Sequence, residues 1–146
     1  MDILKYKNIN INNLNISDFN IDYNSKSFLI QCPIFNDYKI INYNDKKYIE
    51  LNFNETKSSH LNFLTLIDSI ELKINNTINK SIKTQIITNI QNKKSLKVKL
   101  LDDTIFYNSN KEVVTQLYSN KISLLLKLEF YNYYYSWVVV QILQLS

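Results

Sequence analysis

Few residues in this sequence could carry catalysis. It has one histidine, His60, and one cysteine, Cys32. His60 lies at the expected start of a helix, where a surface or capping role is the simpler interpretation than general-base catalysis. Cys32 lies in an apolar segment before Pro33, which favours a small buried thiol over a nucleophile. One cysteine and one histidine cannot complete a zinc site, so we expect neither residue to be catalytic.

Motifs for phosphate or metal binding are equally sparse. The sequence contains no glycine, which excludes a glycine-rich phosphate-binding loop. Asp102 and Asp103 could bind a metal ion, but a solvated β-turn is the commoner role for such a pair. We therefore predict a protein that is not an enzyme, with no catalytic residue, no metal and no cofactor.

A row of lysines is the first feature that could bind nucleic acid. Strand-like alternation over residues 95–101 places Lys97 and Lys99 on one face, with Lys93 and Lys94 at the entry to the strand. Such a row can follow a phosphate backbone. The alternative is an ordinary solvated strand face, or a strand edge protected by lysine.

A cluster of aromatic residues is the second feature, and it comprises Tyr131, Tyr133, Tyr134, Tyr135 and Trp137. Exposed rings at a hairpin tip could stack on unpaired bases, each contributing ~1–3 kcal/mol. The alternative is that some of them fill the core, and we expect at least Trp137 or Tyr135 to be buried. The predicted nucleic-acid-binding residues are therefore Lys93, Lys94, Lys97, Lys99, Tyr131, Tyr133, Tyr134 and Trp137.

Strands are expected to carry both groups. Period-two alternation or short apolar runs predict strands at 27–35 (bent at Pro33), 47–53, 95–101, 122–130 and 135–145. A further strand at 104–107 would follow the turn at Asp102-Asp103. Residues 79–92 fit a second helix or an extended segment, and residues 1–24 fit a strand with a slip at Asn12-Asn13 or a partly ordered arm.

One helix is expected among these strands, at residues 58–79. Ser58 or Ser59 could cap it. Its apolar stripe would comprise Leu61, Leu64, Ile67, Ile70, Ile74 and Ile78. We therefore predict a mostly β fold, a closed or nearly closed antiparallel OB-like barrel with one principal amphipathic helix; the alternative is an α+β sandwich.

The composition limits the setting of the protein. With 146 residues, a net charge of +4 and a pI near 9.0, the chain fits one domain and is compatible with a polyanionic partner. Met1–Lys7 lacks a signal-peptide pattern, and residues 130–146 are too short and polar to span a bilayer. One cysteine permits no internal disulfide, so we expect an intracellular, reducing location. The absence of Gly, Ala and Arg indicates an AT-rich genome, such as that of a large DNA virus, a protist or an AT-rich bacterium.

Six segments, in this order, resemble a family. They are Phe28–Pro33 (apolar-Ile-Gln-x-Pro), Tyr48–Phe53, Phe63–Glu71, Leu96–Leu100, Thr104–Tyr107 and Trp137–Ile142. The series resembles small single-stranded DNA-binding-like proteins of large nucleocytoplasmic DNA viruses, the giant and algal viruses, of which this chain would be a diverged member. The resemblance covers residues 24–146. It implies an OB-type fold related to phage replication proteins.

The resemblance implies a sequence-tolerant single-stranded DNA-binding protein of viral DNA replication or repair. It would act in the host cytoplasm (the virus factory) or nucleus, with single-stranded DNA or RNA as partner, no membrane, and a homo-oligomer or replication proteins as further partners. Residues 1–23 would form an Asn-rich arm or strand, and residues 24–146 the barrel domain. The alternative is a non-enzymatic structural or interaction protein, a minor virion component.

Two departures from the family pattern matter. Where relatives carry glycine in two turns, this chain has Asn36-Asp37 and Tyr131-Asn132, and asparagine can adopt the positive φ that such turns need. The acidic tail of phage-type proteins is replaced by Gln144-Leu145-Ser146, which argues against recruitment of partners through such a tail.

Overall fold

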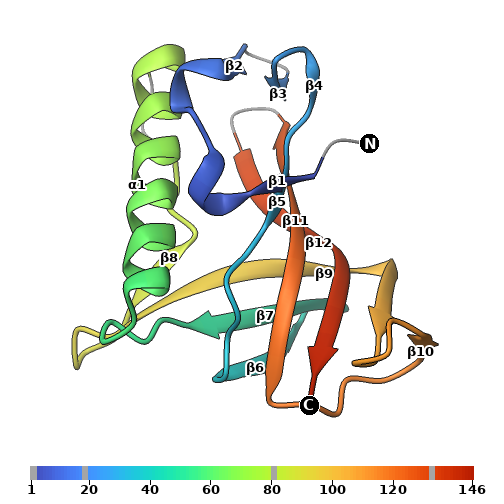
Figure 1. Cartoon of the computed structure of the whole chain (residues 1–146). Coiled ribbons are helices and arrows are strands. Elements are labelled where there is room, and N and C mark those ends of the chain that lie inside the picture. Colours follow the sequence, from blue (N-terminus) through green and yellow to red (C-terminus); the bar gives the residue numbers. More distant parts are fainter. Residues whose placement is uncertain (1–2, 18–19, 80–81, 132–133) are drawn as a thin grey trace.

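The fold is mostly β with one principal helix. The computed structural model describes residues 3–17, 20–79, 82–131 and 134–146. A strongly bent sheet curls beside the helix, and a small second sheet lies near the upper end of that helix (Figure 1). The large sheet has the order β1 (Leu4–Lys5), β5 (Leu29–Gln31), β11 (Lys121–Tyr131), β12 (Tyr134–Leu145), β9 (Lys94–Tyr107), β7 (Lys46–Asn52) and β6 (Tyr38–Tyr43).

The remaining elements are short. β8 (Ile86–Thr88) and β10 (Val113–Val114) both pair with β9. The small sheet comprises β2 (Leu14–Ile16), β3 (Ile21–Tyr23) and β4 (Lys26–Ser27), preceded by the 3-10 turns η1 (Tyr6–Asn8) and η2 (Ile11–Asn13). Segment 79–92 thus contains the short strand β8 and a turn, and no second helix, where the structure describes it. Residues 1–23 contribute β1 to the large sheet, and Leu14 and Ile21 to the core.

The predicted antiparallel barrel is wrong in one respect, because β12 runs parallel to β9. Val138 pairs with Lys99 and Leu143 with Tyr107. The chain crosses from the end of β9 to the start of β11 and leaves a gap between the two strands. β12, the antiparallel hairpin partner of β11, fills that gap and must therefore run with β9. Among the described residues no ladder joins β6 to β1, so the sheet stays open along that edge.

The helix α1 (Ser58–Ile78) confirms the predicted one, with differences at its start. The N-cap residue is Lys57, one residue before Ser58, because the Leu61 N–H donates to the Lys57 carbonyl. No side chain caps the helix, so the predicted capping by Ser58 or Ser59 is wrong. Leu61 is 43% exposed, so it does not belong to the buried stripe. That stripe comprises His60, Phe63, Leu64, Ile67, Ile70 and Ile74.

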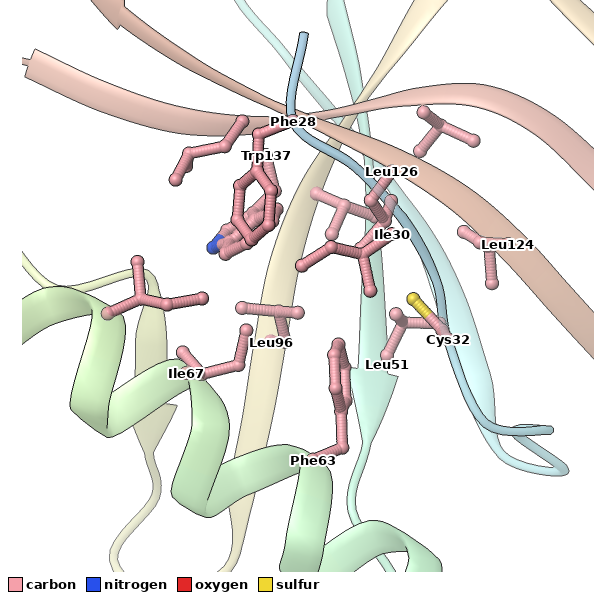
Figure 2. Packing of buried hydrophobic residues seen from close by; sticks show 14 of the residues in the cluster. Phe28, Ile30, Cys32, Leu51, Phe63, Ile67, Leu96, Leu124, Leu126 and Trp137 are labelled. Atoms are coloured by element: carbon pink, nitrogen blue, oxygen red, sulfur yellow. The ribbon is translucent and has the colours of Figure 1, made fainter. Parts of the chain in front are cut away.

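The core lies between α1 and the inner face of the bent sheet (Figure 2). Helix residues Phe63 and Ile67 point toward Leu96 and Leu51 of the sheet, and Trp137 lies beside Phe28. All of these side chains are at most 1% exposed. Alternation along β7, β9 and β12 supplies these inward residues, and it places the intervening side chains on the other face of the sheet.

The predicted turn at Asp102-Asp103 is wrong, because β9 is continuous through both residues. Four residues of β9, 101–104, lie opposite the single residue Val140 of β12, which forms a wide bulge. The Thr104 hydroxyl donates to the Val139 carbonyl at 2.6 Å and accepts the Leu101 N–H at 3.0 Å. Both aspartates are exposed on this bulge. The bulge therefore keeps the two carboxylates in solvent, as a turn would have done.

Asparagine and aspartate take positions that glycine would occupy elsewhere. Positive φ angles occur at Asn24, Ser25, Asn44, Asp45, Asn79, Asn92 and Lys111. Asn44 and Asp45 form the two-residue turn between β6 and β7, and Asn79 ends α1 in the left-handed conformation. Asparagine was expected to replace glycine in the turn at residues 36–37. No positive φ angle is found there; the positive φ angles lie at the other turns named above.

Among the described residues, none of the helices has the length and apolar character needed to cross a membrane.

Candidate nucleic-acid interface

One face of the β6–β7–β9 region points away from the core and carries lysines. Two rows of paired residues cross it: Lys39 pairs with Glu50 and Glu50 with Lys97, while Ile41 pairs with Tyr48 and Tyr48 with Lys99. We call these six residues the basic face. On the opposite side of the same strands, Ile49, Leu51, Leu96 and Val98 are fully buried. The alternation that fills the core therefore fixes the lysines in the outward direction.

Side-chain contacts order the basic face. The Lys97 Nζ lies 4.2 Å from the centroid of the Tyr48 ring, a cation–π distance. The Lys39 Nζ lies 3.2 Å from Glu50 Oε2; the lysine side chain is 66% exposed and the glutamate side chain 12%. Lys39 is therefore the solvent-exposed partner of this pair, while Glu50 lies between Lys39 and Lys97 in its row. The face thus offers an aromatic ring beside cations, with one carboxylate among them.

A groove of about 750 Å³ borders the basic face. Its walls are the start of β6, the loop 53–57 before α1, and the turn between β8 and β9, which approach one another at the lower left of Figure 1. The Phe53 N–H donates to the Lys94 carbonyl, which joins two of these walls. The lysines of the lining are Lys39, Lys57, Lys93 and Lys94, and its acids are Asp37, Glu50 and Glu55.

The four predicted lysines are thereby brought together. Lys93 and Lys94 line the groove, and Lys97 and Lys99 lie on the adjoining face. Lys93 is exposed and the other three are half-buried. The Asn89 side chain holds the turn that presents them, because its Oδ1 accepts the N–H groups of Gln91 and Lys93.

His60 supports the groove from behind, and it is buried, not on the surface as predicted. Its Nδ1 accepts the Asn54 N–H at 2.8 Å, so Nε2 carries the proton and donates to the Ile34 carbonyl at 2.8 Å. Burial lowers the pKa of His60; the bond to Ile34 raises it, and the charge of Lys57 lowers it. Both ring nitrogens bind backbone groups, which makes His60 a structural residue that positions the loop 53–57.

The aromatic cluster is split between core and surface. Trp137 is fully buried and Tyr135 is 3% exposed, which confirms that members of the cluster fill the core. Trp137 was also predicted to bind nucleic acid; in this structure it cannot stack on a base, because its ring is packed beside Phe28. Tyr134 is 72% exposed. Tyr133 and the side chain of Tyr131 lie outside the described residues.

Tyr48 and Lys39 belong to this interface but were absent from the predicted residues. Tyr48 alternates with Ile49 and Leu51 along its strand, and that alternation is the signal in the sequence that could have placed it on the outward face. The sequence could not show that β7 lies directly between β6 and β9, which is what brings Tyr48 beside Lys97 and Lys99.

Cys32 lies away from this surface. Its side chain is 4% exposed and points into the core near Leu51 and Leu124, as predicted (Figure 2). Burial raises the pKa of its thiol well above the ordinary value, so little thiolate forms at neutral pH. In the described part of the chain no group of three or more His, Cys, Asp or Glu residues could hold a metal ion.

Comparison with known proteins gives a fold likeness. No family model matches the sequence, and no curated protein does. The structure is similar to that of the single-stranded DNA-binding protein from bacteriophage Enc34, with a TM-score of 0.50 and 14% identity over 89% of this chain and 86% of that chain. The same phage protein in complex with single-stranded DNA matches with a TM-score of 0.50 and 15% identity, over 89% of this chain and 92% of that chain. At this identity the likeness concerns the fold.

Proposed function

We propose that this protein binds single-stranded DNA, with little sequence preference, through the basic face, and that it is not an enzyme. The observation that carries the proposal is the juxtaposition of Lys97, Lys99 and the Tyr48 ring, all half-buried, on the outward side of one sheet. Lysines neutralise phosphates, and an aromatic ring can stack on any base. The likeness in fold to a phage single-stranded DNA-binding protein, one of whose structures holds single-stranded DNA, supports it.

Binding on this face would exchange internal contacts for contacts with the strand. Lys97 would leave the Tyr48 ring for a phosphate, and a base would take its place over the ring. Lys93 and Lys94 would contact the phosphates that follow, at the groove. Tyr134, together with the predicted Tyr131 and Tyr133, could extend the path of the strand along the β11–β12 hairpin.

The biological setting is part of the proposal. We infer a role in replication or repair of a viral genome, in a large nucleocytoplasmic DNA virus, with residues 24–146 as the body of the barrel and residues 1–23 as an N-terminal segment that adds β1 to its sheet. The location would be the host cytoplasm or nucleus, and RNA, a second copy or replication proteins are further candidate partners. The resemblance of the six sequence segments and the AT-rich composition support this setting.

A structural role is the second candidate. Val113 is 70% exposed and Tyr118 is 64% exposed, and both lie in or after β10, away from the basic face. Tyrosine is enriched at protein interfaces, and Val113 adds an apolar side chain to the same surface region. A minor virion component would use this surface and would need no nucleic acid.

An anisotropy titration separates these candidates. It uses a labelled oligonucleotide, as single strand and as duplex, at two salt concentrations. We expect tighter binding of the single strand, because paired bases cannot offer their faces for stacking. The double substitution Lys97→Gln and Lys99→Gln should weaken binding and reduce the salt slope by about 0.7 per lost phosphate contact. The matched control, Lys5→Gln with Lys111→Gln, removes equal charge outside the basic face and should leave affinity nearly unchanged.

Two outcomes would reject the proposal. If no oligonucleotide binds at low salt, the structural role is the better conclusion. If single strand and duplex bind equally and both double variants lose the same affinity, the net charge of +4 alone is responsible.

A further inference from the structure

The groove beside the basic face has features that a phosphate-binding surface does not need. It is lined by amide side chains as well as by lysines, and Phe53 lies within its lining. We propose that the groove accepts one unstacked base of the bound strand and favours adenine. This inference rests on the proposed function and deepens it, because it gives a largely sequence-tolerant protein one position of base preference.

Phe53 supplies an aromatic surface that is already immobilised. It is half-buried, and its ring centroid lies 5.5 Å from that of Phe35, 6.2 Å from that of His60 and 6.3 Å from that of Phe63. A ring that is already held by three others and also lines a groove can receive a base with little further loss of its own rotamer freedom.

Three amides of the groove are free to read a base edge. The side chains of Asn36, Asn52 and Gln91 line the groove and make no hydrogen bond to any residue that the structure describes. In contrast, the amide oxygens of Asn54 and Asn89 are taken by their own turns. A free amide offers a donor beside an acceptor, the arrangement that pairs bidentately with adenine, and unpaired bases are commonly read in this way while stacked on an aromatic ring.

The groove can hold a nucleotide unit, a base with its sugar and phosphate. Its lining combines Lys39, Lys57, Lys93 and Lys94 with Asp37, Glu50 and Glu55. The lysines at the 93–94 end adjoin the face that would hold the neighbouring phosphates. A volume of about 750 Å³ also leaves room for a base with its sugar. The strand would therefore run along the basic face and insert one base at its end, between Phe53 and the amides.

The test compares a single-stranded oligonucleotide of about twelve thymidine nucleotides with the same strand carrying one central adenine or one central cytosine. Wild-type protein should bind the adenine-containing strand roughly fivefold or more tightly than the other two, the lower end of the effect of one bidentate contact. In the variant Asn52→Ala with Gln91→Ala this preference should disappear, while affinity for the all-thymidine strand and its salt slope stay unchanged. The control, Asn76→Ala with Asn120→Ala, removes two exposed amides on other elements and should keep the preference.

The outcomes separate this inference from the proposed function. Equal affinity of the wild type for the three strands overturns the base-reading groove but leaves single-stranded DNA binding intact. A preference that survives Asn52→Ala with Gln91→Ala also overturns it. If no strand binds, both proposals fail together. In the variant Lys97→Gln with Lys99→Gln, all three strands should bind more weakly with the adenine preference retained; loss of the preference there would contradict a separate base site.

Discussion

The sheet around Lys97 and Lys99 and the tip of the β11–β12 hairpin both carry residues predicted to bind nucleic acid, but they differ in what covers them. On β7 and β9 the inward residues are buried in the core, while the alternate residues of the basic face stay at least partly accessible. Near the hairpin tip, Tyr135 and Trp137 enter the core, whereas Tyr134 stays exposed. Accessibility therefore depends on the side of the strand on which a residue lies, and not on residue type alone.

Gln85 shows how the buried half of the tip is used. Its backbone N–H donates to the Tyr135 hydroxyl at 3.1 Å and its side-chain amide to the Tyr135 carbonyl at 3.3 Å, while its own carbonyl accepts the Lys97 N–H at 3.1 Å. Through Gln85, Tyr135 thus links β12 to the start of β9. At this point β8, and no longer β12, pairs with β9. An aromatic residue of the predicted binding cluster stabilises the strand that carries the lysines.

The largest expected effect is the difference in stability between variants of the buried and the exposed residues near the hairpin tip. Trp137→Ala should lower the free energy of unfolding by about 3–5 kcal/mol, because it removes a fully buried ring and leaves a cavity. Tyr134→Ala should change it by less than about 0.5 kcal/mol, since that side chain is mostly in solvent. Urea unfolding followed by circular dichroism measures both. Similar losses for the two variants would show that the tip is not divided in this way.

The next effect compares the tip with the basic face as a stacking surface. Tyr48→Ala should weaken binding of single-stranded DNA by roughly 1–3 kcal/mol and leave the salt slope nearly unchanged, because stacking neutralises no phosphate. Tyr134→Ala and the predicted Tyr133→Ala should act in the same direction, with a smaller effect, because Tyr134 is not part of the basic face. Titrations at several salt concentrations decide between them. A larger loss for Tyr134→Ala would make the tip the main stacking surface.

The smallest effect concerns pH and the support of the groove. Burial lowers the pKa of His60 in the folded protein, so the unfolded chain binds a proton more readily near its ordinary value of about 6.5. Folding stability from this residue is therefore present above about pH 6.5 and is lost as the pH falls through that value toward the lower folded pKa. Protonation of Nδ1 would also break the bond to the Asn54 N–H.

Urea unfolding at pH 7.5, 6.5 and 5.5 measures this dependence, with the fluorescence of the single, buried Trp137 as the signal. His60→Gln should be less stable than the wild type at pH 7.5, and the difference should shrink as the pH falls. Glu71 serves as an internal contrast, because burial raises the pKa of its carboxyl and makes its contribution change in the opposite direction. A constant difference between wild type and His60→Gln would show that His60 does not titrate against folding.

The sequence predicted the helices and strands better than it predicted which of them lie next to one another. The helix and the two long C-terminal strands follow from periodicity, because a buried face imposes a period of 3.6 or 2 on apolar residues. Leu61 fits the helical period but is 43% exposed, because its neighbour His60, 2% exposed, takes the inward position in the first turn of α1. The continuous β9 was missed because Asp102 and Asp103 suggest a turn, while the bulge held by Thr104 depends on Val139, far along the chain.

The site was predictable in part for the same reason. Lys97 and Lys99 alternate with Leu96, Val98 and Leu100, so their outward direction could be read from the sequence. Which aromatic residue stands beside them could not, because Tyr48 reaches Lys97 through pairing of β7 with β9. The role of His60 was equally hidden, since both of its partners are backbone groups, those of Ile34 and Asn54.

The central place of β12 constrains how the protein is made. This strand, Tyr134–Leu145, lies between β11 and β9 and supplies the buried Trp137, Val139 and Ile142. During translation, β9 leaves the ribosome before β12, the strand with which it must pair, has been made. Until β12 has emerged, α1, β7 and β9 can pack against one another, but the edge of β9 that β12 covers stays unpaired and the core lacks Trp137, Val139 and Ile142. Pairing over such separations is slow and leaves surfaces open to aggregation, so we expect folding to occur late and to benefit from chaperones that hold the nascent chain.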